Sequence, residues 1–325
     1  MKASHSGGCV LSNLRLLLLT DELISCLKEC VSDLRIEESW RHDEIKTINI
    51  SATYSGRKIS AWGSSKNEAI ALSKSVMELI ERIHITQEPT HWINRKNKIK
   101  IDHTEALKRF PVLNQFMNTS SGVAAHLNKK RAELTSIAEI VERHSITKAI
   151  LINQSPKYIH NEIKVWNEFD GYFVALYEFK VPGYGYLYSS AASTNLKMAL
   201  KKVKEEISPL KCWSKHKENI EELIRSKDTE GPLEIQRYHL NRNFDLPFLN
   251  IVKKSTPSPF PDEDIWIAQI APIKQFAKIR SLVITRAFCP VFQPLFFGSI
   301  QANKINPLAI KHESLNQKVD FNVIA

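Results

Sequence analysis

Apolar residues recur at helical spacing in two segments of the chain, and each recurrence predicts an amphipathic helix. The apolar positions are Val76, Leu79, Ile80 and Ile83 in the first segment, and Leu134, Ile137, Ile140 and Val141 in the second. The opposite face of each helix carries the same motif, Glu, two aliphatics, Glu, Arg: Glu78, Glu81 and Arg82, then Glu139, Glu142 and Arg143.

Weaker patterns predict the elements around these two helices. Alternation over 45–54 predicts a half-buried strand, which Ser55, Gly56 and Arg57 turn back into a second strand over 58–62. Further helices are predicted over 20–34 (capped by Thr20), 104–110, 158–169 and 194–207, and strands over 149–152, 172–179, 184–190, 266–270 and 282–285. Residues 210–262 indicate a helix and a proline-rich loop. The whole predicts a mixed α/β (α+β) fold.

Composition narrows the class of protein. The 325 residues are 43% hydrophobic and 25% charged, which is ordinary for a globular chain. No apolar run reaches the ~18 residues of a membrane span, so no membrane partner is expected. Five cysteines without a pairing pattern fit a reducing, cytoplasmic location. Cys26 and Cys30 lie one helical turn apart, but no neighbouring ligand completes a metal site, so we expect buried thiols.

The formal charge of +10 favours an acidic partner such as a nucleotide, a nucleic acid or an acidic peptide. The chain has neither zinc-finger spacing nor an aromatic and basic ribonucleoprotein signature, so nucleic acid is the partner we expect least.

The two Glu–Arg faces allow two interpretations. Each face can be a solvated surface on which an ion pair is worth a few tenths of a kcal/mol, roughly 0.3–0.5 for such helical pairs. Alternatively, the two faces meet across a cleft, where four carboxylates repel unless cations lie between them. Mg²⁺ suits such a site because it takes hard oxygen ligands and usually shares them with phosphates. The second copy of the motif favours the cleft.

Four motifs in order carry a resemblance to a known family. Trp62-Gly63-Ser64-Ser65 precedes the first Glu–Arg helix, and Ser120-Ser121-Gly122-Val123-Ala124-Ala125 precedes the second. Ala199-Leu200-Lys201-Lys202 is followed by Glu206, and Gln293-Pro294-Leu295-Phe296-Phe297-Gly298 lies near the end. Over residues 45–300 the chain resembles the YcaO family, the ATP-using enzymes that modify backbone amides of ribosomal peptides.

This resemblance implies a fold and a domain division. The expected fold has helices packed on mixed or antiparallel sheets around a central nucleotide cleft. We expect a YcaO-like domain over 41–305, preceded by a helical extension over 1–40 and followed by a polar tail over 306–325.

The resemblance also implies a site and an activity. ATP and Mg²⁺ are the implied cofactors, with Glu78, Glu81, Glu139 and Glu142 as metal ligands. Arg82, Ser120, Arg143, Lys202 and Glu206 would line the same nucleotide site. The implied activity is amide activation, by cyclodehydration, thioamidation or a related reaction, in the maturation of peptides such as bacteriocins. The implied partners are a precursor peptide and a separate peptide-presenting protein, because the chain has no room for a fused presenting domain; a homodimer is a further expectation.

Several positions depart from the family pattern. Leu127 and Arg131 replace its Asn and Glu, Lys74 replaces Ser, and Lys202 replaces Arg. Lys74 and Arg131 would each bring a positive charge to where a divalent ion would bind, so the alternative function is a degenerate scaffold that binds a partner or precursor peptide without turnover. In one shared cavity with Lys202 or Glu206 at its rim, these cations and the motif arginines should lower the glutamate pKa values.

Overall fold

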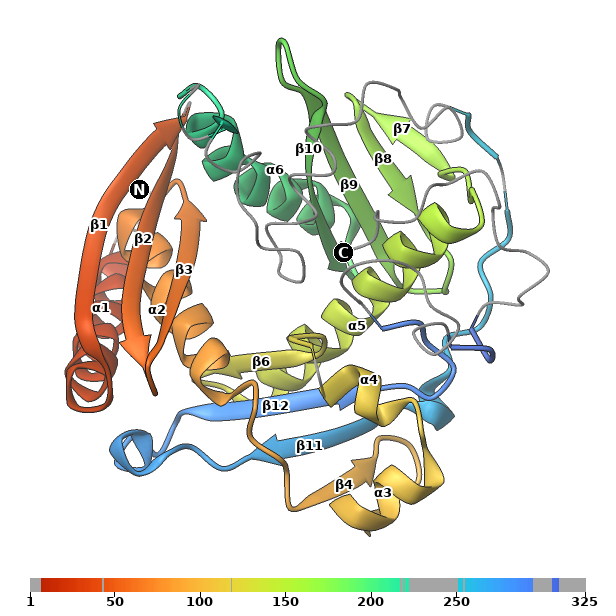
Figure 1. Cartoon of the computed structure of the whole chain (residues 1–325), viewed down its shortest axis with the longest axis horizontal. Helices are drawn as coiled ribbons and strands as arrows, with labels where there is room; N and C mark the ends of the chain where they lie inside the picture. Colours follow the sequence, from red (N-terminus) through yellow and green to blue (C-terminus); the bar gives the residue numbers. More distant parts are fainter. Residues whose placement is uncertain are drawn as a thin grey trace, which may run out of the picture.

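The computed structural model describes residues 7–42, 44–117, 119–216, 218, 220–221, 251–253, 255–294 and 306–309. Its strands form three antiparallel sheets, in the orders β1-β2-β3, β10-β9-β8-β7 and β5-β4-β11-β12-β6. Figure 1 shows these sheets arranged around the middle of the molecule, with α2, α5 and α6 between them. The predicted mixed α/β class is confirmed.

The first sheet is the predicted hairpin with one additional strand. Strands β2 (Ile45–Tyr54) and β3 (Arg57–Ser65) pair in register from Lys46↔Ser65 to Tyr54↔Arg57. Ser55 and Gly56 have φ angles of 49° and 77°, the two positive values that a two-residue type I′ turn requires. Strand β1 (Ser32–His42), which the sequence analysis did not predict, adds to the other edge of β2.

The second sheet contains β7 (Tyr158–His160), β8 (Ile163–Trp166), β9 (Phe173–Lys180) and β10 (Tyr186–Ser193). The third contains β4 (His91–Asn94), β5 (Lys100–Asp102), β6 (Val123–His126), β11 (Trp266–Ile270) and β12 (Val283–Phe288). The helices are α1 (Gly7–Cys30), α2 (Glu68–His84), α3 (His103–Arg109), α4 (Leu113–Met117), α5 (Lys129–Leu151) and α6 (Leu196–Trp213), with 3-10 turns at Asp262–Asp264 and Lys274–Phe276.

One type of turn starts the helices α2, α5 and α6. A strand ends, and an asparagine two residues later accepts a hydrogen bond from the backbone N–H three positions on. The caps are Asn67 (3.3 Å), Asn128 (3.0 Å) and Asn195 (3.2 Å). Four residues after each cap lies a fully buried alanine: Ala71, Ala132 and Ala199. The three helices therefore begin in the same way, each directly after a strand (β3, β6 and β10).

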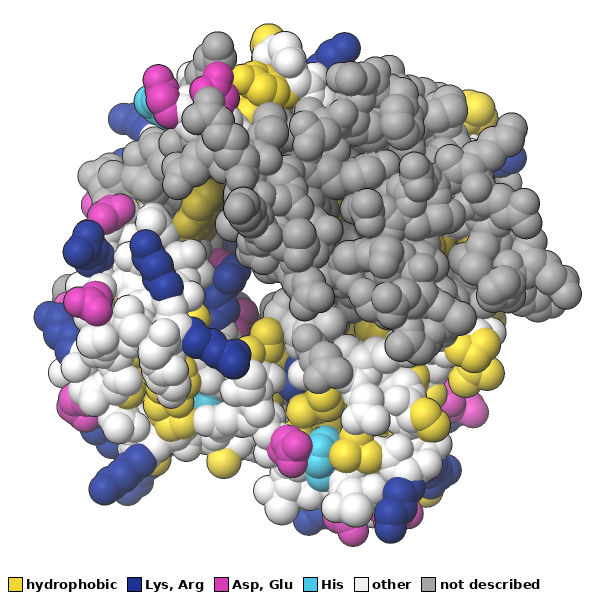
Figure 2. Space-filling model, viewed as in Figure 1, with side chains coloured by type: hydrophobic (Ala, Val, Ile, Leu, Met, Phe, Trp, Pro, Cys, Tyr) yellow, Lys and Arg dark blue, Asp and Glu magenta, His cyan; other side chains and the backbone are white. Residues whose placement is uncertain are grey.

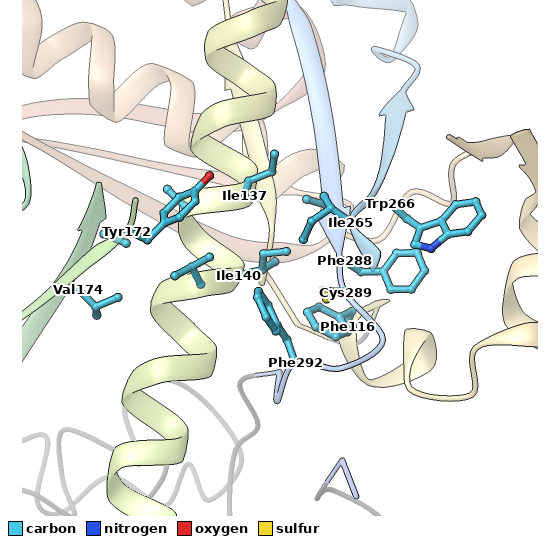
Figure 3. Packing of buried hydrophobic residues seen from close by; sticks show 14 of the residues in the cluster. Phe116, Ile137, Ile140, Tyr172, Val174, Ile265, Trp266, Phe288, Cys289 and Phe292 are labelled. Atoms are coloured by element: carbon cyan, nitrogen blue, oxygen red, sulfur yellow. The ribbon is translucent and has the colours of Figure 1, made fainter. Parts of the chain in front are cut away.

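Helix α5 lies at the centre of the largest hydrophobic core. It contacts β6 and β12 of the third sheet and β9 and β10 of the second. Figure 3 shows Ile137 and Ile140 of α5 between Tyr172 on one side and Phe292 and the Phe116–Phe288 group on the other. These side chains are at most 6% exposed, so burial of this helix holds two sheets together.

Four predictions about local structure were wrong. The first helix extends from Gly7 to Cys30, with Thr20 buried in its interior rather than at a cap, so only part of the 1–40 segment is helical. Residues 149–151 are the last turn of α5, not a strand. The helix expected over 158–169 is instead β7 and β8, because this segment pairs with β9. Helix α6 continues through Pro209 to Trp213, where buried side chains hold it against the sheet.

The other predicted elements are confirmed to within a few residues of their boundaries. Most of 210–262, Leu295 to Gly298 and the tail after residue 309 lie outside the described residues. Among the helices of the described part, none has the length and apolar character to cross a membrane. Cys26, Cys212 and Cys289 are buried free thiols and Cys30 is half-buried, as expected.

Candidate functional site

The three capped helices carry the predicted site residues around one space. Helix α2 carries Glu78, Glu81 and Arg82; α5 carries Glu139, Glu142 and Arg143; α6 carries Lys202 and Glu206. In Figure 1 these helices border a gap above β6, and Figure 2 shows a deep hollow there with acidic and basic side chains on its wall. We call this space the central hollow.

The spacing of these side chains along their helices explains why they reach the same space. The acidic residues Glu78, Glu139 and Glu206 each lie eleven positions after the asparagine cap of their helix. Eleven residues make about three turns at 3.6 residues per turn, so each carboxylate lies on the same side of its helix as the cap. Identical spacing on three helices thus brings three carboxylates to the central hollow.

Three of the glutamates accept hydrogen bonds from the backbone of neighbouring strands. The Glu78 carboxylate accepts from Trp62 N in β3 (3.1 Å), and that of Glu81 from Ala125 N in β6 (2.7 Å). Glu142 accepts from the Ala192 N–H in β10 at 3.1 Å, and its other oxygen lies 2.8 Å from a serine hydroxyl of the same strand. Each bond fixes the carboxylate and also joins its helix to a strand.

Glycines allow the strands to approach the helices this closely. A Cβ on Gly63 of β3 would lie 1.9 Å from the carbonyl oxygen of Ala71 in α2. Gly122, which precedes β6 and has a φ angle of 77°, would place a Cβ 2.2 Å from the carbonyl oxygen of Ala287 and 2.7 Å from Ile140 Cγ2. The two small-residue turns of the sequence motifs are therefore required by packing.

The motif arginines pair with the motif glutamates. Arg82 donates to Glu78 at 2.7 Å, while the Arg143 guanidinium lies 3.9 Å from Glu139 and 3.6 Å from Glu142. Burial alone would lower the pKa of Arg143, but the charges of Glu142 and Glu139 raise it. The arginine of α5 therefore stays charged at the centre of the cluster.

For Glu81 and Glu139 the predicted direction of the pKa shift was wrong. The pKa of Glu81 lies well above its usual value and that of Glu139 is raised to about 8, mainly because both groups are buried, with a contribution from neighbouring glutamates. The pKa of Glu206 is raised to about 7, again mainly because protein surrounds the carboxyl group, although its side chain is exposed to water. In these three groups the loss of solvation outweighs the nearby cations.

These pKa shifts also show that the two Glu–Arg helices share one site. The charge of Glu139 on α5 raises the pKa of Glu81 on α2, and Glu78 on α2 acts on Glu139 in return. Glu78 and Glu142 together raise the pKa of Glu206 on α6. The carboxylates of all three helices therefore lie within one another's electrostatic range.

The basic residues at which the chain departs from the family pattern, Lys74, Arg131 and Lys202, differ in their contacts. Lys74 pairs with Glu205 of α6 at 2.5 Å instead of with the motif glutamates. Arg131 is exposed in the first turn of α5 and makes no ion pair with the motif glutamates among the described residues, so its expected role there was wrong. Lys202 is half-buried, and its charge lowers the pKa of Glu206. Leu127 packs against the core cluster around α2.

Comparison with solved structures identifies the arrangement. The structure of YcaO from Methanopyrus kandleri bound with AMPPCP and Mg²⁺ matches with a TM-score of 0.59 at 10% identity, over 86% of this chain and 91% of that one. A chain of the E. coli microcin synthetase McbBCD complex with pro-MccB17 bound matches with a TM-score of 0.54 at 14% identity, over 80% and 88%. The fold is YcaO-like.

A third similar structure is a heterocyclase in complex with substrate and cofactor, at a TM-score of 0.52 and 10% identity, over 84% of this chain and 52% of that one. No family model and no curated protein matches the sequence. At these identities the structural similarity establishes the fold, and the activity has to be argued from the site.

Two charged residues close to this carboxylate cluster were missed by the sequence analysis. Arg286 of β12 is fully buried, and its guanidinium donates to the carbonyl oxygens of Ile85 (2.9 Å), Phe116 (2.9 Å) and Thr119 (2.5 Å). Burial lowers its pKa to about 10, while the charge of Glu139 acts in the opposite direction. A single arginine in the apolar run of β12 was the available signal. The other missed residue, Glu205, precedes the motif glutamate Glu206.

Ser120 and Gln293, two further residues of the sequence motifs, make hydrogen bonds elsewhere. Ser120 is half-buried, and its carbonyl oxygen accepts from Val123 N in the turn before β6. Gln293 N donates to His144 Nδ1 at 2.9 Å on the other side of α5. Nearby, burial would raise the pKa of Glu168, but hydrogen bonds and charges from His144 and Lys148 lower it to about 2. Leu295 to Gly298 lie outside the described residues.

The donor set of the hollow fits Mg²⁺ held together with phosphates. In the described part of the chain, no three acidic, histidine or cysteine side chains are close enough to hold a metal ion by themselves. Mg²⁺ usually takes only one or two carboxylates and completes its shell with substrate phosphates and water. Carboxylates whose pKa values are raised by burial and, to a smaller extent, by neighbouring carboxylates, such as Glu81 and Glu139, are suitable ligands because a divalent cation compensates both effects.

Proposed function

We propose that this chain is an ATP- and Mg²⁺-dependent subunit that activates backbone amides of a ribosomally made precursor peptide. The observation that supports this proposal is the cluster of carboxylates and arginines that α2, α5 and α6 bring to the central hollow of a YcaO-like fold. Similar structures are described as bound to AMPPCP and Mg²⁺ or to pro-MccB17. By this similarity we propose a precursor peptide and a separate presenting protein as partners.

The proposed chemistry requires mainly positioning and charge compensation from the protein. ATP, when bound, would transfer its γ-phosphoryl group to the amide oxygen and leave as ADP; a Cys, Ser or Thr side chain, or sulfide, would add to the amide carbon, and the oxygen would then depart as phosphate. Glu81 and Glu139 would hold Mg²⁺ against the phosphates. Arg143, which stays charged, would offset negative charge on the phosphates. Backbone bonds to β6 and β10 hold Glu81 and Glu142 in place beforehand.

Nucleotide binding tests this proposal. Thermal unfolding is measured with and without AMPPCP and Mg²⁺, and at 100 times the dissociation constant the ligand should stabilise the protein by about 2.7 kcal/mol. Glu139→Gln should abolish the shift, because it removes a metal ligand. Glu133→Gln, on the same helix, should leave the shift intact. Absence of any shift in the unmodified protein at millimolar AMPPCP, with or without a partner protein, would refute the proposal.

The alternative is a scaffold that binds a partner or precursor peptide without turnover. Two observations favour it: Lys74 is engaged by Glu205 inside the site, and Leu127 packs into the core instead of presenting an amide to a ligand. If the scaffold interpretation is correct, Leu127→Asn combined with Arg131→Glu should create nucleotide binding that the parent lacks. Tight binding by the parent, unchanged in the double variant, would exclude it.

A further inference from the structure

Lys74 connects two of the three helices around the central hollow. Its Nζ donates to the carbonyl oxygen of Ser64 at the end of β3 (2.8 Å) and to the Glu205 carboxylate of α6 (2.5 Å). The two partners are far apart in the sequence and hold the ammonium group from two sides. Its position is thus fixed by a backbone oxygen and a carboxylate, which are oxygen donors of the kind that also bind Mg²⁺.

The two side chains of this ion pair differ in their exposure to solvent. The Glu205 side chain is only 6% exposed, whereas that of Lys74 is 40% exposed. Lys201 approaches the other Glu205 oxygen at 3.7 Å from the solvent side, with a side chain that is 61% exposed. Glu205 therefore has two lysine partners. Lys74 lies on the side of the central hollow and Lys201 on the solvent side, so only Lys74 lies at the site.

The charge of Lys74 reaches the motif residues as well. Among the groups that lower the pKa of Glu206, Lys74 has the largest effect, ahead of Lys202 on the same helix as Glu206. Glu78, one helical turn after Lys74 on α2, acts on Glu206 in the opposite direction. Lys74 is thus the principal cation between the carboxylates of α2 and those of α6.

On the opposite side of the hollow, the described residues place no lysine in an ion pair with Glu81 or Glu139. The Glu81 carboxylate is held by a backbone N–H of β6, and the Glu139 carboxylate lies 3.9 Å from the Arg143 guanidinium, with the charge of Arg286 also acting on it. The carboxylates of the α2–α5 side therefore have arginines as neighbours, whereas a lysine ammonium already lies between the carboxylates of α2 and α6.

We propose that Lys74 takes the place of a divalent cation between α2 and α6, so that metal binding in the hollow is confined to the α2–α5 side. This inference rests on the proposed function, because it assigns the cations of the proposed nucleotide site. Arg131, the other basic departure from the family pattern, does not have this role. One ammonium group carries half the charge of Mg²⁺, and it cannot be removed by a chelator.

Counting bound Mn²⁺ tests the inference directly. Mn²⁺ is titrated into the protein with saturating AMPPCP at pH 8, and free Mn²⁺ is measured by electron paramagnetic resonance. Lys74→Ser should bind one more Mn²⁺ per chain than the unmodified protein, because Glu205, Glu206 and the new hydroxyl then need a cation. Lys74→Arg should keep the original count. Lys201→Ser is the matched control, since it removes the outer cation from the same carboxylate and should also keep it.

Two further measurements separate the outcomes. Lys74→Met keeps the length of the side chain, so if Lys74→Ser does not fold, the extra Mn²⁺ is sought in this variant. A folded variant whose count is unchanged or lower overturns the inference and leaves the proposed function standing. If AMPPCP binds to none of the proteins, the proposed function fails. In that case Mn²⁺ binding is measured without nucleotide. The inference stands if Lys74→Ser binds Mn²⁺ at least tenfold more tightly than the unmodified protein, and it fails otherwise.

Discussion

Gly122→Ala is expected to destabilise the protein through two separable effects. The φ angle of 77° is one that non-glycine residues avoid, at a cost of about 1–2 kcal/mol. The new Cβ would also lie 2.2 Å from the carbonyl oxygen of Ala287 and 2.7 Å from Ile140 Cγ2. Overpacking of this kind typically costs about 1–3 kcal/mol, so the total should be roughly 2–5 kcal/mol.

Gly171 provides the matched control for this prediction. It has the same φ angle of 77°, but a Cβ there would meet no atom within 4 Å. Gly171→Ala should therefore cost only the backbone term of about 1–2 kcal/mol. Both variants restrict the unfolded chain equally, so that contribution cancels in the difference.

The assay is equilibrium unfolding in guanidinium chloride, followed by circular dichroism, for both variants and the unmodified protein. Gly122→Ala should lose about 1–3 kcal/mol more than Gly171→Ala, which is the overpacking contribution alone. Equal losses would show that β6 and β12 can move apart at no cost. In that case the close packing of Gly122 against Ala287 and Ile140 would not be required for stability.

Three other predictions concern buried charges. Arg286→Leu should cost at least about 3 kcal/mol in thermal unfolding, because it leaves several buried carbonyl oxygens without a donor. The control Arg280→Leu, at an exposed position, should change stability by less than about 0.5 kcal/mol. Similar losses in the two variants would contradict a stabilising role for the buried guanidinium of Arg286. Glu139 has a folded pKa of about 8, above the unfolded value of 4.5, so its contribution to stability falls as pH rises between these values, and Glu139→Gln should become more stable relative to the unmodified protein from pH 5 to 8. A constant difference would show that Glu139 is ionised throughout. Glu168 has a folded pKa of about 2, so the stability it contributes is present above pH 4.5 and lost towards pH 2. The deficit of Glu168→Gln at pH 7 should disappear over that range, and a deficit that persists at pH 2 would rule out the interactions of the carboxylate with His144 and Lys148 as its cause.

The sequence predicts the Glu–Arg helices well because their signals are local. Helix α2 has an apolar stripe, an asparagine cap and glutamates on the opposite face, and its observed bounds, Glu68–His84, include the whole predicted stripe. The hairpin of β2 and β3 is equally local, since alternation and a Ser–Gly turn determine it. The spacing of eleven residues from cap to acid, present in α2, α5 and α6, was a further signal that could have related α6 to the other two.

Several of the failures have a common physical cause, which is burial. Strand β8 has four consecutive buried residues, Ile163 to Trp166, so it shows no alternation and was taken for part of a helix. Pro209 would end an isolated helix, but α6 continues because Ile207, Pro209 and Cys212 are buried. The raised pKa values of the carboxylates were missed for the same reason, since a sequence shows charges but not the depth at which they lie.

The hydrogen bonds from strand backbones to Glu78, Glu81 and Glu142 have a consequence for how such sites change over time. Each of these glutamates closes a contact between a helix and a strand, so its loss would leave a backbone N–H without an acceptor as well as weaken ligand binding. Selection for folding alone would therefore keep the three glutamates in a lineage that had stopped using ATP. Positions without such a bond, such as Leu127 and Arg131, are free to vary first, and they are where this chain departs from the YcaO pattern that it resembles.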